Sequence, residues 1–266
     1  MTIPVRKIND IYVVQSLPVG DKPTGQELYE DVIKRHIDFL QPEKIKMTHF
    51  YLEPNNKNNF SESLRYIQSN IPYQQGGILI HFEIHGSNKQ DGLILADNSF
   101  VSWKELVEFL RPINISTCNK LFITMATCYG RYLYIGVDPF EKSPYQAYVS
   151  ASREVKTFEV LESFNTLFEI LIASGDLIYA YLEHEKTNSP FYYKDSLATF
   201  EDTMKMYRNG LDTNPEYKQK ILDHPVLQEQ LSSRQINQAI IDHMIKAAFD
   251  EIVLRQVEAF NFTECD

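Results

Sequence analysis

The chain has little of what marks several common classes of protein. It contains 3 cysteines, 10 glycines and 1 tryptophan in 266 residues, and its formal net charge is −10. No apolar run approaches the roughly 18 residues of a membrane-spanning helix. No block of lysine or arginine suggests nucleic acid or an anionic membrane as a partner. The first residues lack the apolar segment and the cleavage site of a signal peptide, so we expect none.

The cysteines are too few and too far apart to predict a disulfide framework. Cys118 and Cys128 would lie about 30 Å apart if the strand between them rises about 3.3 Å per residue. The third, Cys265, stands almost at the end of the sequence. We therefore expect free thiols and a reducing, cytoplasmic location. In that compartment a well-placed cysteine more often has a chemical role than a structural one.

Apolar runs of strand length alternate with amphipathic segments over the first 155 residues. Thr24–Glu27 and Ser102–Glu105 are capping-box sequences that predict helix starts. Strands alternating with helices predict an α/β fold with a mostly parallel sheet covered by helices on both faces. The expected strands are 10–17, 46–52, 76–84, 120–126 and 145–151, with a short ribbon at 92–98.

The pattern after residue 156 is helical. Apolar residues recur at helical spacing over 158–173, 176–185 and 234–260, and 191–193 predicts a short strand in a surface excursion. We expect residues 1–266 to form a single domain, with an α/β core over 1–155 and a helical C-terminal part over 156–266.

Two apolar runs each end in a reactive side chain. Glycine directly follows the first of these side chains and stands two positions after the second. Ile78–Gly86 ends in His85-Gly86, and Leu121–Gly130 ends in Cys128-Tyr129-Gly130. Right-handed crossovers place the carboxyl ends of parallel strands at one edge of the sheet. His85 and Cys128 are therefore predicted to lie side by side, as a thiol nucleophile and its base must.

Acyl transfer also needs hydrogen-bond donors for the developing oxyanion, and the backbone N–H groups of Gly86 and Cys128 are suitably placed. The structural alternative is a buried cysteine beside a buried histidine, since free cysteine is among the most buried residue types. Glycine after each reactive residue, at the same sheet edge, favours catalysis.

His81 and His85 stand four residues apart, a spacing that forms a zinc pair on a helix. The run Gly-Gly-Ile-Leu-Ile before them predicts a strand instead, and no downstream cluster supplies a third ligand. We expect neither a metal nor an organic cofactor. A carboxylate at Glu83 in a buried strand needs a partner, so we expect it to orient His85 or to form an ion pair.

The two motifs and the strand order resemble the caspase-like (clan CD) cysteine peptidases, including their bacterial CHAT-type relatives, over residues 10 to 155. In that family histidine follows the third strand and cysteine the fourth. Ala126–Gly130 is similar to the caspase signature, with Thr127 inserted before the cysteine. The glutamine and arginine of that signature are absent, so the aspartate preference of caspases is not implied.

The resemblance implies that His85 is the general base or ion-pair partner, that Cys128 is the nucleophile, and that the N–H groups of Gly86 and Cys128 form the oxyanion hole. In the family the fifth strand helps to wall the P1 pocket. Here Ser152, Arg153 and Glu154 follow that strand and are the expected substrate-binding residues. Arg153 would suit an acidic P1 side chain and Glu154 a basic one, so specificity stays open.

The implied function is a cysteine endopeptidase that hydrolyses peptide bonds through a thioester. Its substrate would be a protein or peptide, and an activating partner protein is compatible with this role. Many prokaryotic members of the group are regulated proteases of antiviral defence that cleave a partner protein, which applies here by analogy only. Two alternatives remain open: a catalytically silent caspase-like interaction module, and a cysteine hydrolase of small amides or esters. The loop 131–144 is expected to border the site.

Overall fold

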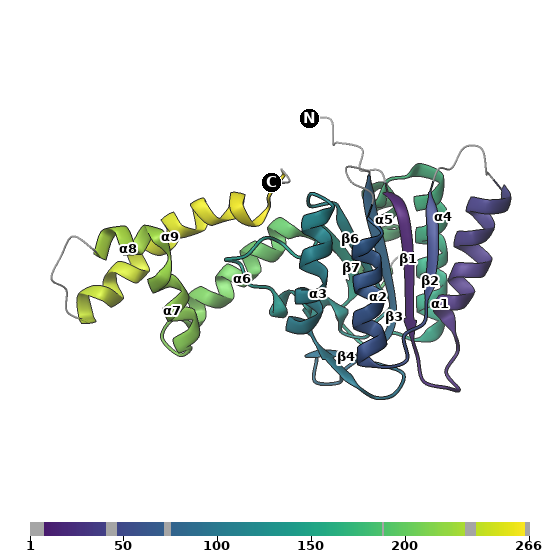
Figure 1. Ribbon diagram of the computed structural model, residues 1–266, viewed down its shortest axis with the longest axis horizontal. Helices are drawn as coiled ribbons and strands as arrows, with labels where there is room; N and C mark the ends of the chain where they lie inside the picture. The colour runs from purple at the N-terminus through teal and green to yellow at the C-terminus, as the bar shows by residue number, and fades with distance from the viewer. Residues whose placement is uncertain (1–7, 41–46, 72–75, 188, 232–237, 264–266) are drawn as a thin grey trace.

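A computed structural model describes residues 8–40, 47–71, 76–187, 189–231 and 238–263 (Figure 1). The main sheet has the strand order β2-β1-β3-β6-β7-β8. Neighbouring strands are parallel, except that β7 and β8 run antiparallel. The predicted α/β fold with a mostly parallel sheet is confirmed. The strands are β1 Ile8–Ser16, β2 Thr48–Leu52, β3 Gly77–Gly86, β6 Leu121–Met125, β7 Ala147–Ala151 and β8 Phe191–Asp195.

A hairpin lies at the carboxyl end of β3. It consists of β4 (Gly92–Ile94) and β5 (Phe100–Ser102), and β4 pairs antiparallel with His85 and Gly86. The hairpin therefore supports the strand end that carries the His-Gly motif.

Helices cover both faces of the sheet, and each face has its own apolar core. On one face, α2 (Lys57–Ser69) and α3 (Trp103–Ser116) share a buried cluster with the sheet. The other face is covered by four helical elements that lie along the strands. They are α1 (Thr24–Glu27), its π-helical continuation η1 (Leu28–Leu40), α4 (Thr157–Ser174) and α5 (Leu177–Glu185). A strand buried on both faces is apolar throughout rather than alternating, which explains the runs in β3 and β6.

The helical C-terminal region is confirmed. Its helices α6 (Ser196–Gly210), α7 (Pro215–Asp223), α8 (Pro225–Leu231) and α9 (Gln238–Phe260) extend away from one edge of the sheet (Figure 1). Phe200, Phe249 and Phe260 belong to the same buried cluster as Tyr145 and Tyr148 of the sheet side. The apolar core is thus continuous from the sheet into these helices. Residues 234–237 of the predicted last helix lie outside the described residues.

The strand at 191–193 has a different place from the one predicted. It is part of β8, which pairs with β7 over Ala147–Ala151 and forms the edge of the main sheet. Its short, partly polar sequence is typical of an edge strand and gives no periodic signal of burial.

One capping box is confirmed and the other is wrong. The Ser102 hydroxyl accepts a hydrogen bond from the Glu105 N–H at 3.2 Å, and the Glu105 carboxylate accepts one from the Ser102 N–H at 3.0 Å. Pro23, not Thr24, is the N-cap of α1. The Thr24 hydroxyl instead donates to the buried carboxylate of Glu83 at 2.5 Å. The Thr24 side chain thus bonds to a residue distant in the sequence, Glu83, instead of to the backbone of its own helix.

The expectation for the cysteines is also corrected. Cys118 is disulfide-bonded, whereas Cys128 is free. Cys265 lies outside the described residues. The prediction of a reducing, cytoplasmic location rested on the expectation of free thiols, so it loses that support. Within the described part of the chain, no helix combines the length and the apolarity needed to cross a bilayer.

Candidate active site

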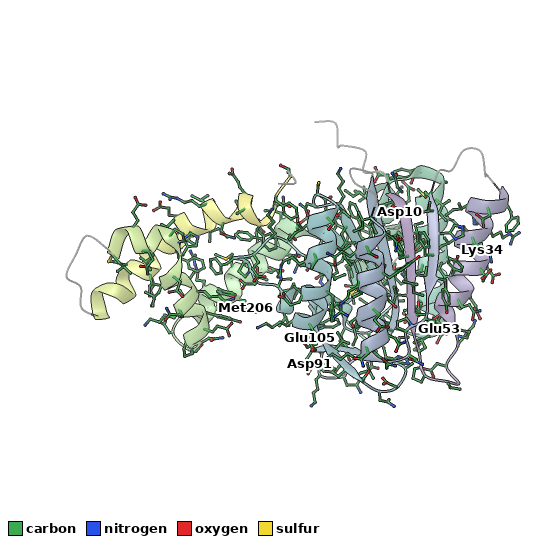
Figure 2. The ribbon with its side chains drawn as sticks, in the orientation of Figure 1. Asp10, Lys34, Glu53, Asp91, Glu105 and Met206 are labelled. Atoms are coloured by element: carbon green, nitrogen blue, oxygen red, sulfur yellow. The ribbon has the colours of Figure 1, made fainter. Side chains whose placement is uncertain are left out.

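The strand ends of β3 and β6 bring the two reactive residues to one pocket. The strands are parallel neighbours in register from Ile78 opposite Leu121 to Phe82 opposite Met125. Three residues beyond this last pair stand His85 and Cys128, and both line a pocket of about 190 Å³. The predicted juxtaposition at the carboxyl edge is confirmed, while the catalytic roles remain a prediction. Figure 2 labels Glu53 near this edge and Asp10 near the opposite one.

The backbone of Gly86 lies directly against that of the cysteine. A Cβ atom at Gly86 would lie 1.8 Å from the Cys128 carbonyl oxygen and 3.2 Å from Thr127 Cγ2. No side chain fits there without separating the two strand ends. Glycine is therefore required by this close approach, as well as leaving room for a substrate carbonyl.

Cys128 is partly exposed on a tight turn. Tyr129 follows it at a φ of 61° in the left-handed region, and a short helix, η2 (Gly130–Gly136), begins at the next residue. This conformation costs a non-glycine residue about 1–2 kcal/mol. Such local strain persists only where the surroundings hold it, and it is common at functional sites.

The Cys128 sulfur contacts the backbone of Val155, two residues before the start of α4. The Val155 N–H donates to Sγ at 3.5 Å, and the Val155 carbonyl oxygen lies 4.0 Å from it. Within the described residues, no hydrogen bond joins Cys128 to His85, and both residues line the same pocket.

His85 has a carboxylate partner that sequence reasoning missed. Asp21 Oδ2 lies 2.6 Å from His85 Nε2, and both side chains are about half exposed, at 43% and 48%. When Asp21 accepts a hydrogen bond from Nε2–H, the other ring nitrogen is left free to accept a proton. Asp21 follows Gly20 in the loop after β1, so it reaches the same edge of the sheet as His85. The sequence signal that could have identified Asp21 is its position just after a strand of the parallel sheet.

The expected substrate-binding residues lie outside the pocket. β7 ends at Ala151, so Ser152, Arg153 and Glu154 form an exposed connection instead of a continued strand with alternating sides. None of the three is among the residues that line the pocket. Arg153 and Glu154 therefore have no place in this pocket as selectors of a P1 side chain.

Arg153 already has a partner for its charge. Its guanidinium makes two hydrogen bonds with Glu159 of α4, at 2.6 and 3.2 Å. These bonds, together with the Lys156 N–H, lower the pKa of Glu159 to about 2. The Arg153 carbonyl accepts a hydrogen bond from the Tyr129 N–H at 3.3 Å, so its backbone supports the turn after Cys128. We interpret Arg153 as a residue that stabilises the turn after Cys128 and does not contact a ligand in the pocket.

The floor of the pocket is polar and buried. Glu83, 4% exposed, lines the pocket together with Thr24. Its carboxylate contacts His81 Nε2 at 3.3 Å, and His81 Nδ1 contacts the Thr124 hydroxyl at 2.9 Å. Glu83 was expected to orient His85 or to form an ion pair; its carboxylate contacts the His81 ring instead, and not His85. No group of three or more potential metal ligands occurs among the described residues.

The loop 131–144 does not border the pocket as expected. No residue of this loop is among those that line it. The C-terminal helices hold the loop instead: the Ser143 N–H donates to the Phe260 carbonyl at 2.9 Å, and the Gln256 side chain donates to the Pro139 carbonyl at 3.0 Å.

No protein-family model matches the chain, and no curated protein matches it at a significant level.

Proposed function

We propose that the protein is a cysteine peptidase in which Cys128 is the nucleophile, His85 the general base and Asp21 the residue that positions His85. The observation that carries the proposal is the meeting of an Asp21–His85 pair and a free cysteine at one pocket, from three different strand ends. A base oriented by a third group, next to a nucleophile, is the usual arrangement for covalent catalysis.

The reaction begins with proton transfer from the Cys128 thiol to His85. The thiolate attacks the carbonyl carbon of the scissile peptide, and the N–H groups of Gly86 and Cys128 stabilise the resulting oxyanion. The intermediate collapses when the C–N bond breaks, and the leaving amine takes the proton from His85. A thioester on Cys128 remains.

Water completes the cycle. His85 removes a proton from the water molecule as its oxygen attacks the thioester carbonyl. The C–S bond then breaks, the carboxylic acid product leaves, and the sulfur regains a proton from His85. Each step uses groups of this chain and water, so the proposed reaction needs neither a metal nor an organic cofactor.

The test is a comparison of wild type with Cys128→Ala and His85→Ala on a diverse peptide library, with new termini identified by mass spectrometry. Cleavage by wild type and by neither variant is expected. The rate at which iodoacetamide labels Cys128 is measured in parallel and is expected to fall in His85→Ala. Labelling without any peptide cleavage would favour a hydrolase of small amides or esters. An inert Cys128 would favour a silent interaction module.

A further inference from the structure

Glu83 lines the pocket and stands two positions before His85 on β3. Residues 81, 83 and 85 share one face of β3, because side chains alternate along a strand. The exposed side-chain fraction falls from 48% at His85 to 5% at Glu83 and 0% at His81. Two residues along a strand span about 7 Å. A group that enters beside His85 therefore has to extend about this far to reach the carboxylate.

The carboxylate of Glu83 is held by neutral or titratable donors only. The Thr24 hydroxyl donates to Oε1 at 2.5 Å, and His81 Nε2 lies 3.3 Å from Oε2. His81 is itself enclosed by the rings of Phe164 and Phe168, at centroid distances of 4.7 and 5.4 Å. Within the described residues, His81 is the only ion-pair partner of Glu83, and no lysine or arginine pairs with it.

The stem of Glu83 packs closely against the backbone of Gly25. A Cβ atom at Gly25 would lie 2.9 Å from Glu83 Cβ and 3.1 Å from Glu83 Cγ. A buried, ionised carboxylate costs free energy unless a positive charge or several hydrogen bonds compensate it. Glu83 is also one of the residues that line the pocket, where a ligand can supply that charge.

The other lining residues suit a long side chain with an apolar stem. Leu17, Ile84, Ala126, Val155 and Val160 line the pocket. The basic lining residue Lys22 already pairs with Glu27 at 2.9 Å, on the exposed side of the site. An acidic ligand side chain would meet a like charge at Glu83, whereas lysine or arginine would place its methylene groups along the apolar lining.

We propose that this pocket is the P1 pocket and that it selects lysine or arginine, with Glu83 as the counter-ion. The inference rests on the proposed peptidase function and names its substrate class. It assigns specificity to a residue on β3 that lies before the catalytic histidine, not to the exposed residues after β7. A positive side chain in the pocket gives Glu83 a lysine or arginine partner, which no described residue supplies.

The experiment uses irreversible acyloxymethyl ketone peptides that differ only at P1, with lysine, norleucine or aspartate. Alkylation of Cys128 is followed by mass spectrometry, so the result does not depend on turnover. Norleucine has a straight apolar side chain without the charge. Wild type is expected to react with the lysine probe on the order of 30-fold faster than with the norleucine probe, because removing one partner of a buried charge pair has an effect of this size. The aspartate probe is expected to be the slowest.

Glu83→Gln should abolish the preference for lysine over norleucine, and Glu83→Asp should keep most of it. Glu53→Gln is the matched control: Glu53 pairs with Gln15 at 3.4 Å and does not line the pocket. Equal reactivity of all three probes in wild type, or an unchanged preference in folded Glu83→Gln, would overturn the inference while leaving the peptidase intact. If no probe labels Cys128 and iodoacetamide does not either, the proposed function fails and the inference fails with it.

Discussion

Asp21 Oδ2 lies 2.6 Å from His85 Nε2, although the two residues are 64 positions apart in the chain. The contact joins the loop after β1 to the end of β3, two strands that pair in parallel along most of their length. It turns a histidine–cysteine pair into a set of three polar groups at one edge of the sheet. The chemistry proposed above depends on this arrangement.

Replacing Asp21 tests its positioning role. We expect Asp21→Asn to lower kcat/KM about a hundredfold or more, because the imidazole loses the carboxylate that selects its tautomer and stabilises its protonated form. The pH at which Cys128 alkylation is half-maximal should also change, which a merely structural role would not produce. Asp38→Asn is the matched control, since Asp38 pairs with His49 at 3.0 Å away from the pocket. Full activity of Asp21→Asn would contradict the assignment.

Replacing Gly86 tests the close contact between the two strand ends. Gly86→Ala places a methyl group 1.8 Å from the Cys128 carbonyl oxygen, so one strand end has to move. We expect a loss of at least about 1–3 kcal/mol in the free energy of unfolding, as for other overpacked sites, together with a large loss of activity.

Gly130→Ala is the comparison for this variant. Its added methyl group would lie 3.1 Å from Ser150 Cβ, a contact that a small shift relieves. Urea denaturation and the iodoacetamide labelling rate of Cys128 are measured for both. A Gly86→Ala variant as stable and as reactive as Gly130→Ala would be inconsistent with the structure.

The Arg153–Glu159 pair predicts a pH dependence that is separate from specificity. Glu159 has its pKa lowered from 4.5 to about 2, chiefly by its hydrogen bonds with Arg153. A carboxylate whose pKa is lower in the folded state contributes stability above pH 4.5, and this contribution is lost as the pH falls toward 2. Because the pair is exposed to solvent, we expect a contribution below about 1 kcal/mol.

In Arg153→Ala the pKa of Glu159 should rise toward 4.5, as measured by an NMR titration of its side chain. The P1 preference should stay the same, because Arg153 does not line the pocket. A reversal of P1 preference in this variant would restore the role that the sequence suggested for Arg153.

The C-terminal helices hold the loop that follows the nucleophile, and Phe140 lies at the centre of this contact. Its ring centroid is 5.5 Å from that of Tyr207 and 5.9 Å from that of His224. Phe140→Ala should lower the free energy of unfolding by about 2 kcal/mol, because it removes a partly buried ring from between two others. Amide hydrogen exchange over 138–143 should become faster. Phe158→Ala, which removes an exposed ring, is the control and should change neither quantity measurably.

The sequence by itself determined the strands of the core, the helices between them and the place of the two reactive residues. Apolar runs and turn residues report local structure, and the rule for parallel strands converts their order into a common edge. His85 and Cys128 could therefore be brought together without a structure. The capping box at Ser102 was predictable for the same reason, since all its partners lie within one helical turn.

Only the tertiary structure decided which side chains meet across long separations. Thr24 donates to Glu83 instead of capping its own helix, Asp21 reaches His85, and β8 joins the main sheet as its edge. These contacts depend on the register of the strands and on the path of the loops, which leave no periodic trace in the sequence. For this reason His85 and Cys128 could be identified from local motifs, while the residues proposed to position His85 and to select a substrate could not.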